Sequence, residues 1–215
     1  MSLFYKMWIP SDIDTSSVDA NQTINTPTLV LVHGSGPHDH NEQIGEYATF
    51  RDLAKGLCEQ YHIIVFTYDK RSCGPTANPP CLQNTPPFCE LYTDPPSPCI
   101  NITNISYNDF VADAISAVQF IATEFAYITA QNIIPVGHSQ GASIVPWVAD
   151  YMNLTTAISL MGTGIPIDEV IMYQLEASGQ YNESQLAETQ ETFDMIMDGD
   201  FDDYDTVYIL GVPAT

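Results

Sequence analysis

The segment from Gly137 to Gly141 reads Gly-His-Ser-Gln-Gly, and its position constrains the fold of this chain more than any other feature. The mostly apolar stretch 132–136 before it predicts a short buried strand, and the mostly apolar stretch 142–149 after it predicts a helix. A Gly-x-Ser-x-Gly motif between a strand and a helix is typical of a nucleophile elbow, a strained turn that lifts the serine Oγ above a sheet. We therefore predict that Ser139 is a nucleophile. The alternative is an ordinary turn whose serine has no chemical role.

Four further segments make a family resemblance specific. They are 34–39 (Gly-Ser-Gly-Pro-His-Asp), 50–54 (Phe-Arg-Asp-Leu-Ala), 68–71 (Tyr-Asp-Lys-Arg) and 161–169 (Met-Gly-Thr-Gly-Ile-Pro-Ile-Asp-Glu), the last followed by Gln174. Over residues 28–72 and 106–215 the chain resembles the bacterial esterase and dienelactone-hydrolase-like branch of the α/β-hydrolases. The resemblance implies a serine hydrolase that acts on carboxylic esters, or else on an amide or a thioester.

The same resemblance implies an oxyanion hole. The apolar run 28–32 predicts a strand buried on both faces of a parallel sheet, and it leads directly into the sequence His-Gly-Ser-Gly-Pro. In the family this loop gives one backbone N–H to the tetrahedral oxyanion, and the residue after the serine, here Gln140, gives the other. Ser35 is the expected loop donor, with Gly34 and Gly36 as alternatives.

The remaining periodicity fits one architecture. The expected helices are 50–60, 106–125, 168–180 and 183–198, and the expected strands also include 62–68 and 156–161. Ser106 and Asp109 match a capping box at the start of the second helix. Alternating strands and helices predict an α/β fold, a three-layer α/β/α sandwich with a mostly parallel sheet. We expect an incomplete α/β-hydrolase core at 1–167 and a partial helical cap at 168–215.

A serine triad also needs a histidine base and a carboxylate, which in this family follow the serine in the chain. The five histidines are His33, His38, His40, His62 and His138, and none of them follows Ser139. We therefore expect the chain to be truncated at its C-terminal end, and at its N-terminal end too, because only 27 residues precede the first apolar strand. The parent protein is expected to be an ester hydrolase, and these 215 residues by themselves are expected to be inactive.

Other polar residues near the motifs receive structural interpretations. His138 is expected to pack against neighbouring strand ends or to border the pocket, since side chains that are adjacent on a tight elbow point in different directions. His38 and His40 match no common zinc spacing and predict a solvated loop. Asp69 and Arg71, at the end of a strand, are expected to form an ion pair with each other.

The charge balance limits the partners. Five Lys and Arg against 27 Asp and Glu give a net charge of −22, which repels nucleic-acid phosphates and anionic lipid. No apolar run approaches the length of a membrane span. A small-molecule ester is the expected partner, with no metal or other cofactor, and the oligomeric state is left open.

The segment 72–104 is an insert rich in proline and cysteine. Its cysteines are Cys73, Cys81, Cys89 and Cys99, and no Cys-x-x-Cys pair occurs. We predict a loop held by two disulfides, with all three pairings open, and a buried free thiol at Cys58.

Five Asn-x-Ser/Thr sequons suggest a glycosylating compartment. Their asparagines are Asn21, Asn101, Asn104, Asn153 and Asn182. With the predicted disulfides they favour a secreted or lumenal eukaryotic glycoprotein. The first ten residues are too short and too poorly patterned for a signal peptide.

Two alternatives to the esterase stay open. The first is a non-catalytic relative that serves as a binding protein after losing its triad. The second is an acyltransferase or a thioesterase with the same nucleophile.

Overall fold

The structure is a computed structural model that describes residues 5–13, 15, 24–44, 46–72, 105–198, 208–209 and 212–213. The insert cysteines Cys73, Cys81, Cys89 and Cys99 and the sequons at Asn21, Asn101 and Asn104 lie outside these residues. The chain divides into two compact units, Met1–Gly162 and Thr163–Thr215, and each is described by itself.

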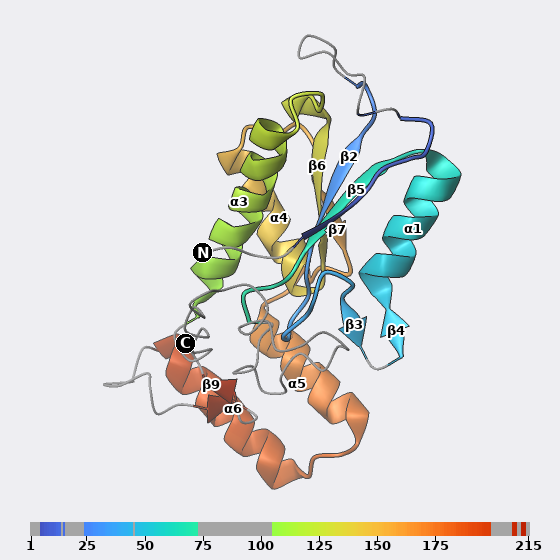
Figure 1. Ribbon diagram of the computed structural model, residues 1–215. Coiled ribbons are helices and arrows are strands. Elements are labelled where there is room, and N and C mark those ends of the chain that lie inside the picture. Colours follow the sequence, from blue (N-terminus) through green and yellow to red (C-terminus); the bar gives the residue numbers. More distant parts are fainter. Residues whose placement is uncertain are drawn as a thin grey trace, which may run out of the picture. The chain divides into compact units, whose positions relative to one another are not determined.

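The first unit is built on a five-stranded sheet in the order β1-β5-β2-β6-β7 (Figure 1). The strands are β1 (Tyr5–Trp8), β5 (Ile64–Tyr68), β2 (Thr28–Val32), β6 (Ile133–His138) and β7 (Ile158–Leu160). Only β1 runs antiparallel to its neighbour, and the other pairs in this sheet are parallel. The predicted apolar strands and the mostly parallel sheet are confirmed.

Helices cover both faces of this sheet (Figure 1). One face carries α1 (Thr49–Tyr61), and the other carries α3 (Tyr107–Glu124) and α4 (Gln140–Tyr151). Shorter elements are β3 (Gln43–Ile44), β4 (Tyr47–Ala48) and the 3-10 turn η2 (Ala130–Asn132). The three-layer α/β/α sandwich predicted from the sequence is confirmed.

Alternation along β2 divides the core in two. Val30 and Val32 join the cluster under α3 and α4, and Leu29 and Leu31 join the cluster under α1. Because successive side chains of a strand point to opposite faces, a strand covered on both faces must be apolar throughout. Cys58 belongs to α1 and is buried as a free thiol, as predicted.

The second unit contains two helices and a short two-stranded ladder. They are α5 (Ile167–Ser178), α6 (Glu183–Asp198), β8 (Tyr208–Ile209) and β9 (Val212–Pro213). Gly179 ends α5 with φ 63°, a left-handed conformation that glycine adopts at little cost. Asn182 and Gln185 exchange backbone-to-side-chain hydrogen bonds of 3.0 Å at the start of α6. The two predicted helices are confirmed, and their role as a cap stays a prediction.

No helix in the described part of the chain is long and apolar enough to cross a membrane. Within the same residues no group of three or more His, Cys, Asp or Glu side chains is arranged to hold a metal ion.

The start of α4 lies directly against the backbone of the central strands. A Cβ atom added to Gly141 would stand 2.1 Å from the carbonyl oxygen of Val32, and one added to Gly137 would stand 2.0 Å from that of Gly141. Both carbonyl oxygens belong to the backbone and cannot move away by a change of side-chain rotamer. Both positions therefore require glycine, which accounts physically for the two glycines of the Gly-x-Ser-x-Gly motif.

We predict that Gly141→Ala lowers the free energy of unfolding by at least about 3 kcal/mol, because the added methyl group forces α4 away from β2. Urea denaturation followed by circular dichroism measures the loss. Gly56→Ala on α1 is the matched control, since among the described residues no atom outside its chain neighbours and the nearby backbone of its own helix lies within 4 Å of its added Cβ. The control should gain about 0.5–1 kcal/mol. Equal stabilities for the two variants would contradict the close approach.

Candidate active site

Ser139 occupies the turn between β6 and α4 in a strained conformation. Its φ is 53° and its ψ is −112°, a positive-φ backbone that non-glycine residues seldom adopt. Its N–H donates a 2.9 Å hydrogen bond to the carbonyl oxygen of Leu160 at the end of β7. The turn therefore has the geometry of a nucleophile elbow.

The loop after β2 lies beside this serine. A Cβ atom built on Gly34 would stand 3.2 Å from the Cβ of Ser139. Gln140 is the first residue of α4, and the first N–H groups of a helix have no partner within it and carry partial positive charge. The structure thus brings the loop, the serine and the helix N-terminus together, as the sequence motifs predict.

Glu42 is the last residue of the loop after β2, and sequence reasoning missed it. Its side chain is fully buried, and its Oε1 accepts hydrogen bonds from the N–H of Gly34 at 2.7 Å and from Nδ1 of His138 at 3.0 Å. Its Oε2 has no hydrogen-bond partner among the described residues. An ionised Glu42 can only accept, and in that state the bond to Nδ1 requires the imidazole proton on that nitrogen.

The contacts of Glu42 bear on the choice of loop donor for the oxyanion hole and on the place of His138. Gly34 already donates its N–H to Glu42, so it is excluded as the loop donor of an oxyanion hole, and Ser35 and Gly36 are left. His138 is the last residue of β6 and contacts Glu42 in the loop after β2, and its predicted packing against neighbouring strand ends or at the border of the pocket stays a prediction.

Lys70 lies two residues after the end of β5, and its side chain reaches Gly34 and Gln140. It exposes only 5% of its surface, and its Nζ donates 2.7 Å hydrogen bonds to the carbonyl oxygen of Gly34 and to Oε1 of Gln140. The Nζ also lies 4.3 Å from the ring centre of Phe110. Burial lowers the pKa of Lys70 from 10.5 to about 7, and the nearby Glu42 carboxylate opposes this shift.

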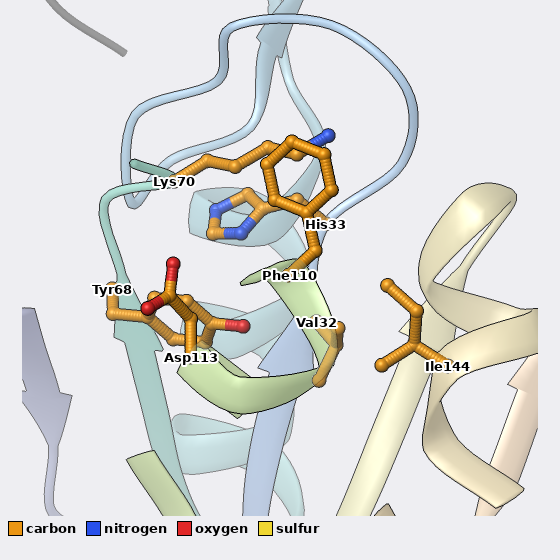
Figure 2. A pocket seen from close by; sticks show the side chains of 7 residues that line it. All are labelled: Val32, His33, Tyr68, Lys70, Phe110, Asp113 and Ile144. Carbon is orange, nitrogen blue, oxygen red and sulfur yellow. The ribbon is translucent and has the colours of Figure 1, made fainter. Parts of the chain in front are cut away.

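A small pocket lies on the inner side of this lysine, between the sheet and the helices α3 and α4 (Figure 2). It is lined by Val32, His33, Tyr68, Lys70, Phe110, Asp113 and Ile144. His33 is buried there, and burial lowers its pKa well below the ordinary range, so the ring is neutral. Its Nε2 lies 3.0 Å from the carbonyl oxygen of Asp39.

The residues on either side of Lys70 anchor it to different segments. Oδ1 of Asp69 accepts hydrogen bonds of 2.7 Å from the backbone N–H and from Nδ1 of His40. Arg71 forms ion pairs with Asp109 and Asp113 on α3. The predicted ion pair between Asp69 and Arg71 is therefore wrong, because each side chain has partners on another part of the chain.

The predicted solvated loop at His38 and His40 is also wrong. His38 exposes only 9% of its surface, and its Nε2 lies 2.5 Å from the carbonyl oxygen of Ser35. Burial lowers the pKa of His38. His40 pairs with the buried Asp69, so residues 38–40 pack against Ser35 of the same loop and against the chain after β5 instead of extending into solvent.

Comparison with known proteins identifies the family. A family model described as the alpha/beta hydrolase family matches residues 29–205, which is most of the chain. The chain belongs to the alpha/beta hydrolase family. The assignment agrees with the strand order and with the elbow at Ser139.

This alpha/beta hydrolase is 29% identical to Esterase EstD of Thermotoga maritima over 150 residues, which are 70% of the chain and 30% of EstD. Similar solved structures include the apo form of Thermogutta terrifontis esterase 2, with 18% identity, a TM-score of 0.41 and coverage of 67% of this chain and 40% of that one. Another is the Paleococcus ferrophilus monoacylglycerol lipase, with 16% identity, a TM-score of 0.41 and coverage of 85% and 52%. The chain thus spans less than a third of EstD and about half or less of the two solved structures.

Sequence reasoning located the serine, the loop and the helix start of this alpha/beta hydrolase, but it missed the side chains that connect them. A signal for Lys70 exists, since it follows the carboxyl end of a buried parallel strand, where ligands bind in open α/β sheets. Glu42 has no such signal, because it is a single acid in a loop far from His138 in sequence.

The lowered pKa of Lys70 predicts a pH-dependent stability for this alpha/beta hydrolase. The unfolded chain holds the Lys70 proton up to pH 10.5, whereas the folded chain releases it near pH 7. The unfolded state binds more protons between these values, so the contribution of Lys70 to stability rises with pH across this window, by at most about 1.4 kcal/mol per pH unit.

Urea unfolding of the wild type and of Lys70→Met at pH 7 and pH 9.5 tests this expectation. The stability difference between them should move in favour of the wild type as the pH rises. Lys55→Met, which replaces an exposed lysine on α1, should show no such change relative to the wild type. A constant difference between wild type and Lys70→Met would show that Lys70 titrates normally.

Proposed function

We propose that this alpha/beta hydrolase acts on carboxylic esters, with Ser139 as the nucleophile. The observation that carries the proposal is the positive φ of 53° at Ser139, on a strand-to-helix turn with Gly34 packed beside it. A strained conformation persists only where the surrounding structure enforces it, and such positions cluster at active sites. The similarity to an esterase over 70% of the chain supports the choice of ester substrates.

The proposed chemistry is acyl transfer in two steps. The Ser139 Oγ attacks the ester carbonyl carbon while a general base takes its proton, and the carbonyl electron pair moves onto oxygen. The backbone N–H groups of Ser35 and Gln140 donate to this oxyanion. The carbonyl then re-forms, the bond to the leaving oxygen breaks, and the protonated base returns its proton to that oxygen, so the alcohol departs. Water hydrolyses the acyl-enzyme by the same route. No histidine follows Ser139 in these residues, and Nδ1 of His138 lies 3.0 Å from Oε1 of Glu42.

The compartment is a separate proposal. We propose a secreted or lumenal glycoprotein, and the exposure of both described sequon asparagines, Asn153 and Asn182, supports it, since glycans require a surface position. The disulfides of the insert stay a prediction.

We predict that Ser139→Ala lowers kcat for p-nitrophenyl butyrate by at least about 10⁴-fold, because the acyl-enzyme can no longer form. The assay uses the whole protein as its source organism produces it. Ser116→Ala on α3 is the matched control, since this exposed serine donates a hydrogen bond to the carbonyl oxygen of Ala112 on its own helix, and the kcat of the variant should equal that of the wild type. Undiminished hydrolysis by Ser139→Ala would overturn the proposal. A source protein inert toward every ester would favour the non-catalytic alternative.

We predict that the 215 residues produced alone hydrolyse the same ester at least about 10³-fold more slowly than the whole protein, because only binding and the oxyanion hole contribute without a base. Ser139→Ala should then cause little further loss in the 215-residue chain. A large loss on His138→Ala in that chain would contradict this expectation, because it would make His138 the base.

A further inference from the structure

The Gly34 backbone is held from both sides by buried side chains. Its N–H donates to Glu42 at 2.7 Å, and its carbonyl oxygen accepts from Nζ of Lys70 at 2.7 Å. Glycine is the residue with the greatest backbone freedom, so an unrestrained Gly34 would let the loop take several orientations. The two contacts remove that freedom beside Ser139.

The lysine contact also fixes the direction of the neighbouring N–H. In a trans peptide the carbonyl of one residue and the N–H of the next lie in one plane and point in opposite directions. Lys70 holds the carbonyl of Gly34 and thereby sets the direction of the N–H of Ser35. The same Nζ holds the side chain of Gln140 at 2.7 Å, so one ammonium group spans both residues that would donate to the oxyanion.

The contacts of Lys70 give no reason to expect that this lysine stabilises the folded protein. Both hydrogen-bond acceptors of its Nζ are neutral oxygens, and within the described residues it forms no ion pair. A buried charge without a bonded counter-charge is costly, and an apolar side chain of similar size would often be more stable there. Asp69 binds His40 in the loop after β2, and Arg71 binds Asp113 on α3. These contacts fix the backbone on both sides of Lys70, so its side chain has a defined direction in spite of the cost of burial.

We propose that Lys70 is a positioning residue that sets the oxyanion hole, by holding the Gly34–Ser35 peptide and Gln140 in one fixed arrangement, with Glu42 completing the clamp on Gly34. The proposal rests on the proposed function of Ser139. Lys70 touches neither the ester nor the reacting atoms. It acts through the orientation of the two backbone donors, so its effect belongs to the transition state and not to substrate binding.

The test is Lys70→Met in the whole protein, assayed with p-nitrophenyl butyrate. Loss of one oxyanion donor costs about 10²–10³ in kcat in other hydrolases, so we expect kcat to fall about 10²-fold with KM within about twofold of the wild type. Affinity for an alkyl trifluoromethyl ketone, which forms a tetrahedral oxyanion on the serine, should fall in parallel with kcat/KM. Lys55→Met, with its exposed position on α1, should change none of these values.

A second variant keeps the proposal testable if Lys70→Met does not fold. Gln140→Ala retains the backbone donor but removes the side chain that Lys70 holds, and we expect kcat to fall about tenfold with KM unchanged. Wild-type kcat in both variants, or equal losses of ketone and substrate affinity, would overturn this inference while Ser139→Ala stays inactive. An active Ser139→Ala would instead overturn the proposed function itself, so the two failures are distinguishable.

Discussion

The backbone contact between α4 and β2 is the constraint on which the site depends. The Cβ position of Gly141 lies 2.1 Å from the carbonyl oxygen of Val32, so the helix can start here only if residue 141 has no side chain. With the helix this close, the chain has one residue in which to turn from β6 into α4, and Ser139 takes the strained φ of 53°. The energy of core packing under β2 and α4 thus holds the strain at the serine.

Three consecutive residues after β5 connect the segments that surround Ser139. Asp69 binds the His40 loop, Lys70 binds Gly34 and Gln140, and Arg71 binds Asp113 on α3. The chain contains only five Lys and Arg against 27 acidic residues, and two of the five stand here. Scarce positive charge is therefore concentrated where the loop beside Ser139 must be fixed relative to the sheet and the helix.

Local patterns predicted most of the fold, and contacts distant in sequence escaped prediction. The apolar run at Thr28–Val32 and the helix Glu183–Asp198 match the predicted bounds, because periodicity and apolar runs are properties of neighbouring residues. The capping contact between Ser106 and Asp109 spans three residues and was predicted for the same reason. In the site, the serine motif was visible as a local pattern. The partners of Glu42 and Arg71 lie up to 96 and 42 residues away in sequence, so no local pattern contains both members of a pair. Glu42 was therefore missed, and Arg71 was paired with the wrong residue.

The choice of lysine at position 70 follows from its protonation. Burial lowers the pKa of Lys70 to about 7, so near neutral pH the folded protein holds both the ammonium and the neutral amine. A neutral amine still has two N–H groups, which equals the number of oxygens it must hold, Gly34 O and Gln140 Oε1. An arginine would stay charged and would bear the full cost of burial at every accessible pH. Lysine can therefore release the buried charge without giving up either hydrogen bond, so the clamp on Gly34 and Gln140 persists while only its cost to stability changes with pH.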